Sequence, residues 1–255
     1  LGKEDPKRFL EKFCIYSKRF KIKKTIWLHG SSVGEILSVI PVINILEKNK
    51  KIKKILLSSS TLSSSFIIEK YKFKKTSHVY FPIDNNYLAK RFIKYWNPQI
   101  AIFIESEIWP NMIEKIKNKD LPLILLNARL TKKTFKKWTK LDFFLKNIFS
   151  KFDLCIPQNQ ETYYYLKKLG SKKLKLLGNL KLCEINQKNL IKLNSSQIKF
   201  FKSKKVLLIG YSTHLSEENF CADIYKKIKK NKNEIIILIP RHIERANLII
   251  DDLNS

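Results

Sequence analysis

The stretch TIWLHGSSVGE, from Thr25 to Glu35, decides the fold of the first half of the chain. Its apolar run Ile26-Trp27-Leu28 is typical of a buried strand, His29-Gly30 ends that strand, and a helical pattern begins at Glu35. The predicted strand–turn–helix unit brings a carboxylate to the end of a strand. The chain carries 51 Lys and Arg residues against 22 Asp and Glu, so the position of this acid needs an explanation.

The same alternation of strand and helix continues along the 255 residues. Near-continuous apolar strands separated by helices predict an α/β fold with a parallel sheet covered on both faces. The predicted strands are 25–28, 54–58, 78–81, 99–104, 123–126, 153–156, 174–177, 206–209 and 234–239, and the predicted helices include 36–48, 87–95, 109–119 and 161–169. Binding sites in such sheets form at the carboxyl ends of the strands.

A polar stretch, CEINQKNLIKLNSS at 183–196, interrupts the alternation, which restarts at KVLLIGYSTH. We therefore expect a first α/β domain over residues 1–182, a linker over 183–204 and a second α/β domain over 205–255. A domain of roughly 50 residues is small for an independent α/β fold. The second domain is therefore predicted to be incomplete.

The formal net charge of +29 is compatible with nucleic acid or an acidic membrane as a partner. The lysines are scattered over every segment, which equally indicates that lysine is the default surface residue. A nucleic-acid-binding α/β module would need a contiguous basic face with stacking aromatics and would have no use for acids at strand ends. Those acids argue against it, and no nucleic-acid partner is expected.

The cysteines give no sign of a metal site or of a disulfide framework. Cys14, Cys155, Cys183 and Cys221 form no CxxC pair, and with four scattered histidines they show no metal-ligand spacing. We expect no metal and no cofactor, and reduced thiols of the kind found in cytosolic compartments.

Glu35 has two possible roles. An acid in the first turn of a helix stabilises the helix dipole, and an exposed turn of Gly and Ser also suits a general base. The turn lacks the spacing of a phosphate loop, and a carboxylate there suits a hydroxyl that must lose a proton. The dipole lowers the pKa of such a group, whereas burial raises it.

More polar groups are expected at the next strand ends. In AIFIESEIWPN, Glu105 and Glu107 leave a buried strand two residues apart and point the same way if the strand geometry persists. Alternatively, they are dipole partners of the helix that opens at Pro110. In LLNARLT, Asn127 and Arg129 follow another strand, and Arg129 is placed to pair with either acid.

The second domain offers groups suited to an anion. GYSTHLSEE puts Ser212, Thr213 and His214 at the start of a helix, where backbone N–H groups bind phosphate. The alternative is an ordinary N-cap with acids in the first turn. IPRHIER adds Arg241, whose guanidinium suits a phosphate. This division is typical of an enzyme that holds a hydroxyl acceptor in one domain and a nucleotide donor in the other.

With these motifs in order, the sequence resembles the 3-deoxy-D-manno-octulosonic acid (Kdo) transferases of Gram-negative bacteria, which add Kdo to the lipid A precursor during lipopolysaccharide synthesis. The resemblance runs through HGSSVGE, HVYFPID, ESEIWPN, LNARLT, PQNQET, GNLK, STHLSEE and IPRH. It covers nearly the whole chain.

The resemblance implies a glycosyltransferase of the GT-B type, with two Rossmann-like doubly wound domains, metal-independent transfer, CMP-Kdo as donor and the lipid A precursor as acceptor. Glu35 matches the catalytic base, Glu105 and Lys181 match positions of transition-state stabilisation, and Pro240 and Arg241 match part of the CMP site. The full set of expected binding residues is Ser31, Ser32, Gly34, Glu107, Asn127 and Arg129 for the acceptor, and Ser212, Thr213, His214, Pro240 and Arg241 for the nucleotide. A GT-B enzyme using another activated sugar is the alternative.

The resemblance also implies a place at the cytoplasmic face of the inner membrane. The stretch FCIYSKRFKIKK, 13–24, interleaves lysines with apolar side chains and suits a membrane surface, or else a lysine-rich helix packed on its own domain. The N-terminal anchor of many members and the nucleotide motifs expected beyond Ser255 are missing from this sequence. We therefore expect little or no transferase activity from this chain alone.

Overall fold

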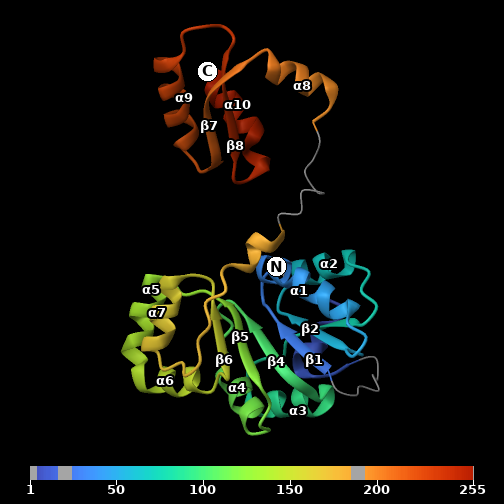
Figure 1. The fold of residues 1–255 in the computed structure, drawn as a ribbon. Coiled ribbons are helices and arrows are strands. Elements are labelled where there is room, and N and C mark those ends of the chain that lie inside the picture. The colour runs from blue at the N-terminus through green and yellow to red at the C-terminus, as the bar shows by residue number, and fades with distance from the viewer. Residues whose placement is uncertain (1–4, 17–24, 185–192, 255) are drawn as a thin grey trace. The chain divides into compact units, whose positions relative to one another are not determined.

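The structure is a computed structural model that describes residues 5–16, 25–184 and 193–254. The chain divides into two compact units, Leu1–Asn186 and Gln187–Ser255, both drawn in Figure 1. The expected linker, 183–204, includes the boundary between them. Part of that range forms a helix, α8 (Ser195–Lys202), and residues 185–192 lie outside the described part of the chain.

The first unit is built on a six-stranded parallel sheet in the order β3-β2-β1-β4-β5-β6. Its strands are β1 (Thr25–His29), β2 (Ile55–Ser59), β3 (Thr76–Tyr80), β4 (Pro98–Ile104), β5 (Leu123–Ala128) and β6 (Leu154–Pro157). Its described helices are η1 (Phe9–Phe13), α1 (Val33–Lys48), α2 (Leu62–Lys70), α3 (Asn86–Trp96), α4 (Pro110–Lys117), α5 (Lys132–Trp138), η2 (Thr139–Leu141), α6 (Asp142–Ser150), α7 (Gln160–Lys168) and η3 (Leu180–Glu184). The strand order reverses between β1 and β4, and ligands of such sheets bind at this switch point.

Both faces of the sheet are buried, because successive strand residues point to opposite sides. Leu28 and Ile104 pack in one cluster with the apolar face of α1, whereas Trp27 and Phe103 pack in the other with residues of α3 and α4. Figure 1 shows α1 and α2 on one side of the sheet and α3 and α4 on the other. The two-sided burial holds the ends of β1 and β4 rigidly beside each other, with His29 in register with Phe103.

Eight of the nine predicted strands are confirmed as to their existence, with ends that differ by a few residues. The strand expected at 174–177 is wrong. Only Leu174 makes a bridge, to Cys155, after which the chain turns through Gly178 at φ +94 and enters η3. The predicted helices correspond to α1, α3, α4 and α7.

Over residues 193–254, the second unit contains one pair of parallel strands, β7 (Lys205–Thr213) and β8 (Glu234–Pro240). Besides α8, its helices are α9 (Glu217–Ile228), η5 (Ile243–Arg245) and α10 (Ala246–Asn254). Gly210 allows β7 to pass close to its neighbours, since a Cβ there would lie 2.8 Å from Leu238 Cδ2. Val206, Ile209 and Tyr211 of β7 remain exposed.

Candidate active site

The acids predicted at the strand ends gather at the switch point of the first unit. Glu35 lies in the first turn of α1, directly after β1, and Glu105 and Glu107 follow β4, the neighbour of β1 in the sheet. All three carboxyl side chains are buried. The sheet topology, rather than closeness in sequence, therefore brings them to one edge.

The turn before α1 is shaped around the carboxylate of Glu35. The backbone N–H of Ser31 donates to Glu35 Oε2 at 2.6 Å, and Ser32 Oγ accepts from the Glu35 N–H at 3.3 Å in a capping box. A Cβ at Gly30 would lie 3.1 Å from the Cβ of Glu35, so glycine allows this close approach. Gly34 is exposed and open, since a Cβ there would meet nothing within 4 Å. The turn therefore has free space on its outer side at Gly34.

Burial determines the pKa of Glu35. Removal of the carboxyl from water and, second, the negative charge of Glu107 raise the pKa of Glu35 to about 7, against an ordinary 4.5. The hydrogen bonds from the Ser31 and Ser32 turn act in the opposite direction and are outweighed. A carboxyl group that titrates near neutral pH is suited to accept a proton from a hydroxyl.

Glu107 is held by three donors on one oxygen. His29 Nε2 at 3.0 Å, Ser31 Oγ at 2.6 Å and Trp109 Nε1 at 2.6 Å all bond to Glu107 Oε2. Burial opposes ionisation of this carboxyl, but the bonds to His29, Ser31 and Trp109 outweigh it and lower the pKa of Glu107. Glu107 was expected to contact a substrate, and the structure instead occupies its carboxylate with partners inside the chain.

His29 is the residue of this site that the sequence analysis missed. Its Nδ1 lies 3.0 Å from Ser58 Oγ, and Ser58 Oγ in turn accepts from Trp27 Nε1 at 2.8 Å. Because a carboxylate only accepts, the Nε2–H of His29 donates to Glu107. Nδ1 faces both the hydroxyl and, at 3.2 Å, the carbonyl oxygen of Ser58. The contacts thus link Trp27, Ser58, His29 and Glu107 in one chain. A histidine as the last residue of a strand was the available signal.

Glu105 pairs with Lys181 from η3. The ammonium nitrogen of Lys181 lies 2.6 Å from Glu105 Oε1, as an ion pair without the alignment of a hydrogen bond. Glu105 has left-handed backbone geometry, φ 57, so the strand geometry that would make Glu105 and Glu107 point the same way does not persist beyond β4. Arg129, expected as the partner of these acids, makes neither pair within the described residues. Its side chain is exposed, and only its backbone N–H bonds the Glu105 carbonyl, at 3.3 Å.

Asn127 positions η3. Its side chain is fully buried, and its Oδ1 accepts from the backbone N–H of Leu180 at 3.1 Å, one residue before Lys181. Its φ of 54 is left-handed, a conformation that asparagine tolerates. Asn127 was expected to bind substrate. In the structure its side chain instead holds the backbone of η3 at Leu180, and it acts on Lys181 through that backbone. Ser32 and Gly34 are exposed on the outer side of the turn before α1.

In the second unit, the predicted nucleotide residues lie at the carboxyl ends of β7 and β8. The expected place of Ser212, Thr213 and His214 at the start of a helix is wrong, because Ser212 and Thr213 end β7 and α9 begins only at Glu217. The Arg241 N–H donates to the Thr213 carbonyl at 3.0 Å, which fixes the two strand ends together. Ser212 is left-handed at φ 58, Thr213 is buried, and the His214 N–H donates to Glu217 at the start of α9 at 2.8 Å.

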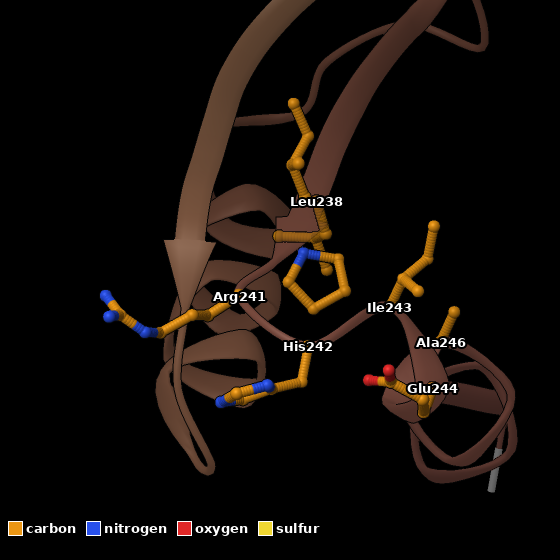
Figure 2. Close-up of a pocket in the computed structure, with 8 residues that line it drawn as sticks. Leu238, Arg241, His242, Ile243, Glu244 and Ala246 are labelled. Atoms are coloured by element: carbon orange, nitrogen blue, oxygen red, sulfur yellow. The ribbon is translucent and has the colours of Figure 1, made fainter. Parts of the chain in front are cut away.

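A pocket of about 490 Å³ follows β8 and includes Pro240, Arg241, His242 and Glu244. Figure 2 shows the side chains of Arg241 and His242 extending to the same side of the loop, away from Ile243 and Ala246. Both are exposed. The pocket therefore presents a cation that the described carboxylates do not pair, as an anion site requires.

Comparison with known proteins identifies relatives of the whole chain. The sequence pattern of the family described as 3-Deoxy-D-manno-octulosonic-acid transferase (kdotransferase) matches residues 7–183. The 3-deoxy-D-manno-octulosonic acid transferase of Rickettsia bellii (strain RML369-C) is 36% identical over 257 residues, which is 99% of this chain and 60% of the relative. That of Haemophilus influenzae (strain ATCC 51907 / DSM 11121 / KW20 / Rd) is 27% identical, covering 90% of this chain and 55% of the relative. The chain thus spans little more than half the length of these relatives.

Solved structures agree with the predicted fold class. A putative UDP-N-acetylglucosamine 2-epimerase from Listeria monocytogenes matches with a TM-score of 0.63 at 11% identity, over 89% of this chain and 66% of that one. The UDP-GlcNAc 2-epimerase from Neisseria meningitidis bound to UDP-GlcNAc gives 0.60 at 12% identity, over 91% and 70%. At such identities the likeness concerns the fold alone, which is α/β of the GT-B type.

Proposed function

Because this chain belongs to the family of 3-deoxy-D-manno-octulosonic acid transferases, we propose that it transfers Kdo from CMP-Kdo to a glucosamine hydroxyl of the lipid A precursor, as part of a longer enzyme. The first unit is the acceptor domain and the second carries part of the donor site. Transfer needs neither a metal nor a cofactor.

The proposal assigns the proton transfer to Glu35. Its carboxylate takes the proton of the acceptor hydroxyl, the oxygen forms a bond to the anomeric carbon of Kdo, and the bond from that carbon to the phosphate oxygen of CMP breaks, so that CMP leaves with the electron pair. The observation that carries the assignment is a buried carboxyl with a pKa raised to about 7, beside an open turn at the switch point of the sheet.

Lys181 and Glu105 stabilise the transition state in this proposal. Positive charge develops on the sugar ring as the bond to phosphate breaks, and negative charge develops on the departing CMP. A carboxylate and an ammonium 2.6 Å apart present one charge for each. Asn127 supports the pair by holding η3.

The donor groups belong to the second unit. Arg241 binds the phosphate of CMP, and Ser212, Thr213 and His214 line the approach to it from β7. The proposal is supported by the pocket after β8 and by the exposed guanidinium of Arg241. A different activated sugar remains the alternative donor.

The chain works at the cytoplasmic face of the inner membrane in this proposal. Phe13 and Ile15 are exposed, as a membrane-facing stretch requires. The lysines of that stretch at 18, 21, 23 and 24 lie outside the described residues. Among the helices that the structure describes, none is long and apolar enough to cross a bilayer.

The test is equilibrium binding of the chain to a detergent-solubilised lipid A precursor, with a random DNA duplex as competitor, at near-physiological and then raised salt. Acceptor binding is expected to survive salt, because acyl burial is not screened, while DNA binding collapses. Binding of DNA alone, or loss of both ligands together, would contradict the proposal and favour the nucleic-acid-binding alternative or simple polycation behaviour.

A pair of variants locates the acceptor site. Gly34→Leu fills the open side of the turn and should abolish acceptor binding. Lys48→Leu adds the same side chain at the exposed C-terminal end of the same helix and should leave binding intact. Equal affinities of the two variants would place the acceptor elsewhere. Incubated with CMP-Kdo and the precursor, the unmodified chain should show little or no turnover.

A further inference from the structure

Two of the three buried acids at the switch point, Glu35 and Glu107, are joined by one serine. Ser31 donates its backbone N–H to Glu35 Oε2 and its hydroxyl to Glu107 Oε2, each at 2.6 Å. The position of the turn that holds Glu35 is therefore fixed partly by Glu107. Ser60 Oγ, 3.0 Å from Ser31 Oγ, fixes the same hydroxyl from the end of β2.

Glu107 is held in its ionised form and does not act as a second base. Three donors converge on its Oε2, and they come from three different places: β1, the turn after it, and Trp109 at the start of α4. Behind His29, Ser58 contacts Nδ1 and accepts from Trp27, which holds the imidazole with Nε2 directed at the carboxylate. Each of these bonds favours the ionised form of Glu107.

We propose that Glu107, with His29 behind it, is a positioning residue that acts on Glu35 in two ways: it fixes the Ser31 turn, and its charge opposes ionisation of Glu35. The proposal rests on the assignment of Glu35 as the base. It adds that Glu107 keeps Glu35 able to accept a proton at neutral pH. Two carboxyl groups in one buried site divide their roles when hydrogen-bond donors outweigh burial at one of them and not at the other.

The other charged groups at this edge are accounted for. His29 lies on β1 and bonds Glu107, and Glu105 at the end of β4 is paired with Lys181 of η3, which packs beside α1. Since Lys181 is already paired, Glu107 is the charge that raises the pKa of Glu35, next to burial itself.

The test is the titration of Glu35 followed by NMR on the chain labelled with 13C at the glutamate carboxyl groups, its resonance assigned by its loss in Glu35→Gln. In Glu107→Gln the negative charge is gone while size and burial are kept. The midpoint of Glu35 should fall by about one pH unit or more. Glu47→Gln, at the far end of the same helix, removes the same charge from a carboxylate that is also hydrogen-bonded and should leave the midpoint in place.

An unchanged midpoint in Glu107→Gln, or an equal fall in Glu47→Gln, would overturn the proposal. If Glu107→Gln does not fold, Trp109→Phe removes one donor and keeps the charge, and the midpoint of Glu107 should then rise. No change there would equally overturn it. Because the titration uses no substrate, it is independent of acceptor binding, so failure here leaves the proposed function standing and failure of acceptor binding leaves this result standing.

Discussion

The two strand-end sites of the molecule are built in opposite ways. In the first unit, Glu35, Glu105 and Glu107 are buried and bonded to partners from β1, the turn before α1, α4 and η3. In the second unit, Arg241 and His242 follow β8 at the rim of an open pocket, and both are exposed. The first arrangement fixes charges against each other, and the second leaves a charge available to a ligand.

This difference determines which chemistry each site can perform. A proton acceptor at neutral pH needs a carboxyl removed from water, which only a closed core can provide. An anion site needs an unpaired cation and backbone N–H groups at a strand or helix end, which a small two-stranded unit can present. The contrast therefore predicts that the first unit is sensitive to its core and the second to its surface charge.

The largest expected effect is on the core of the first unit. Phe103→Ala should lower the free energy of unfolding by about 3–5 kcal/mol, because Phe103 is fully buried between the sheet and its helices. Ile209→Ala, on the exposed face of β7 at 58% exposure, should change it by less than about 0.5 kcal/mol. All four tryptophans lie in the first unit, so urea unfolding followed by tryptophan fluorescence measures that unit, and hydrogen exchange of β7 and β8 measures the other. Similar losses in both variants would contradict the contrast.

Substitutions at one glycine in each unit extend this comparison of the two units. Gly210→Ala places a Cβ 2.8 Å from Leu238 Cδ2 and should destabilise the second unit by about 1–3 kcal/mol. Gly34→Ala meets open space in a helix and should stabilise the first unit by about 0.5–1 kcal/mol. The same two measurements apply, and a destabilised Gly34→Ala would mean that the turn is more crowded than its geometry indicates.

Arg241→Gln tests the open site. Loss of one charge-assisted bond to phosphate costs about 1.5–3 kcal/mol, so the affinity for CMP, measured by calorimetry, should fall about tenfold or more. Lys232→Gln removes a positive charge from the opposite end of β8, before its first residue, and should leave CMP affinity nearly unchanged. Equal losses would reduce the site to general attraction by a basic surface.

A further expected effect is on the pH dependence of stability. With a pKa of about 7 folded and near 4.5 unfolded, Glu35 binds more protons in the folded state between these values, so its contribution to stability falls as pH rises from 4.5 to about 7. Glu35→Gln should flatten this fall in the urea midpoint read by tryptophan fluorescence. A curve parallel to that of the unmodified chain would contradict the raised pKa.

The sequence predicted the fold well because the strands of the first unit are apolar runs that need no context. The strand predicted at 174–177 did not form, because a strand at a sheet edge needs partner bonds that continue. Here the bonds to Cys155 are limited to those of Lys173 and Lys175 on either side of Leu174. Glu35, Glu105 and Glu107 were found from their places after strands. The role of His29 was not, because it depends on Glu107, which lies 78 residues further along the chain.

The partners of the acids and of Asn127 and Arg129 could not be predicted from the sequence either. Asn127 looked like a substrate ligand until its amide oxygen proved to hold Leu180, and Arg129 looked like the partner of acids that Lys181 and His29 occupy. Such pairings depend on how η3 and the β1 turn fold back on the sheet edge, and local sequence patterns carry no information about that.

The most direct test of the account is the titration of the Glu35 carboxyl group in the unmodified chain, by NMR of 13C-labelled glutamate. A midpoint of about 7 is predicted, which would make Glu35 a proton acceptor at neutral pH. A midpoint near the ordinary 4.5 would mean that the helix dipole and the Ser31 turn prevail over burial, and that Glu35 is a helix cap rather than a base.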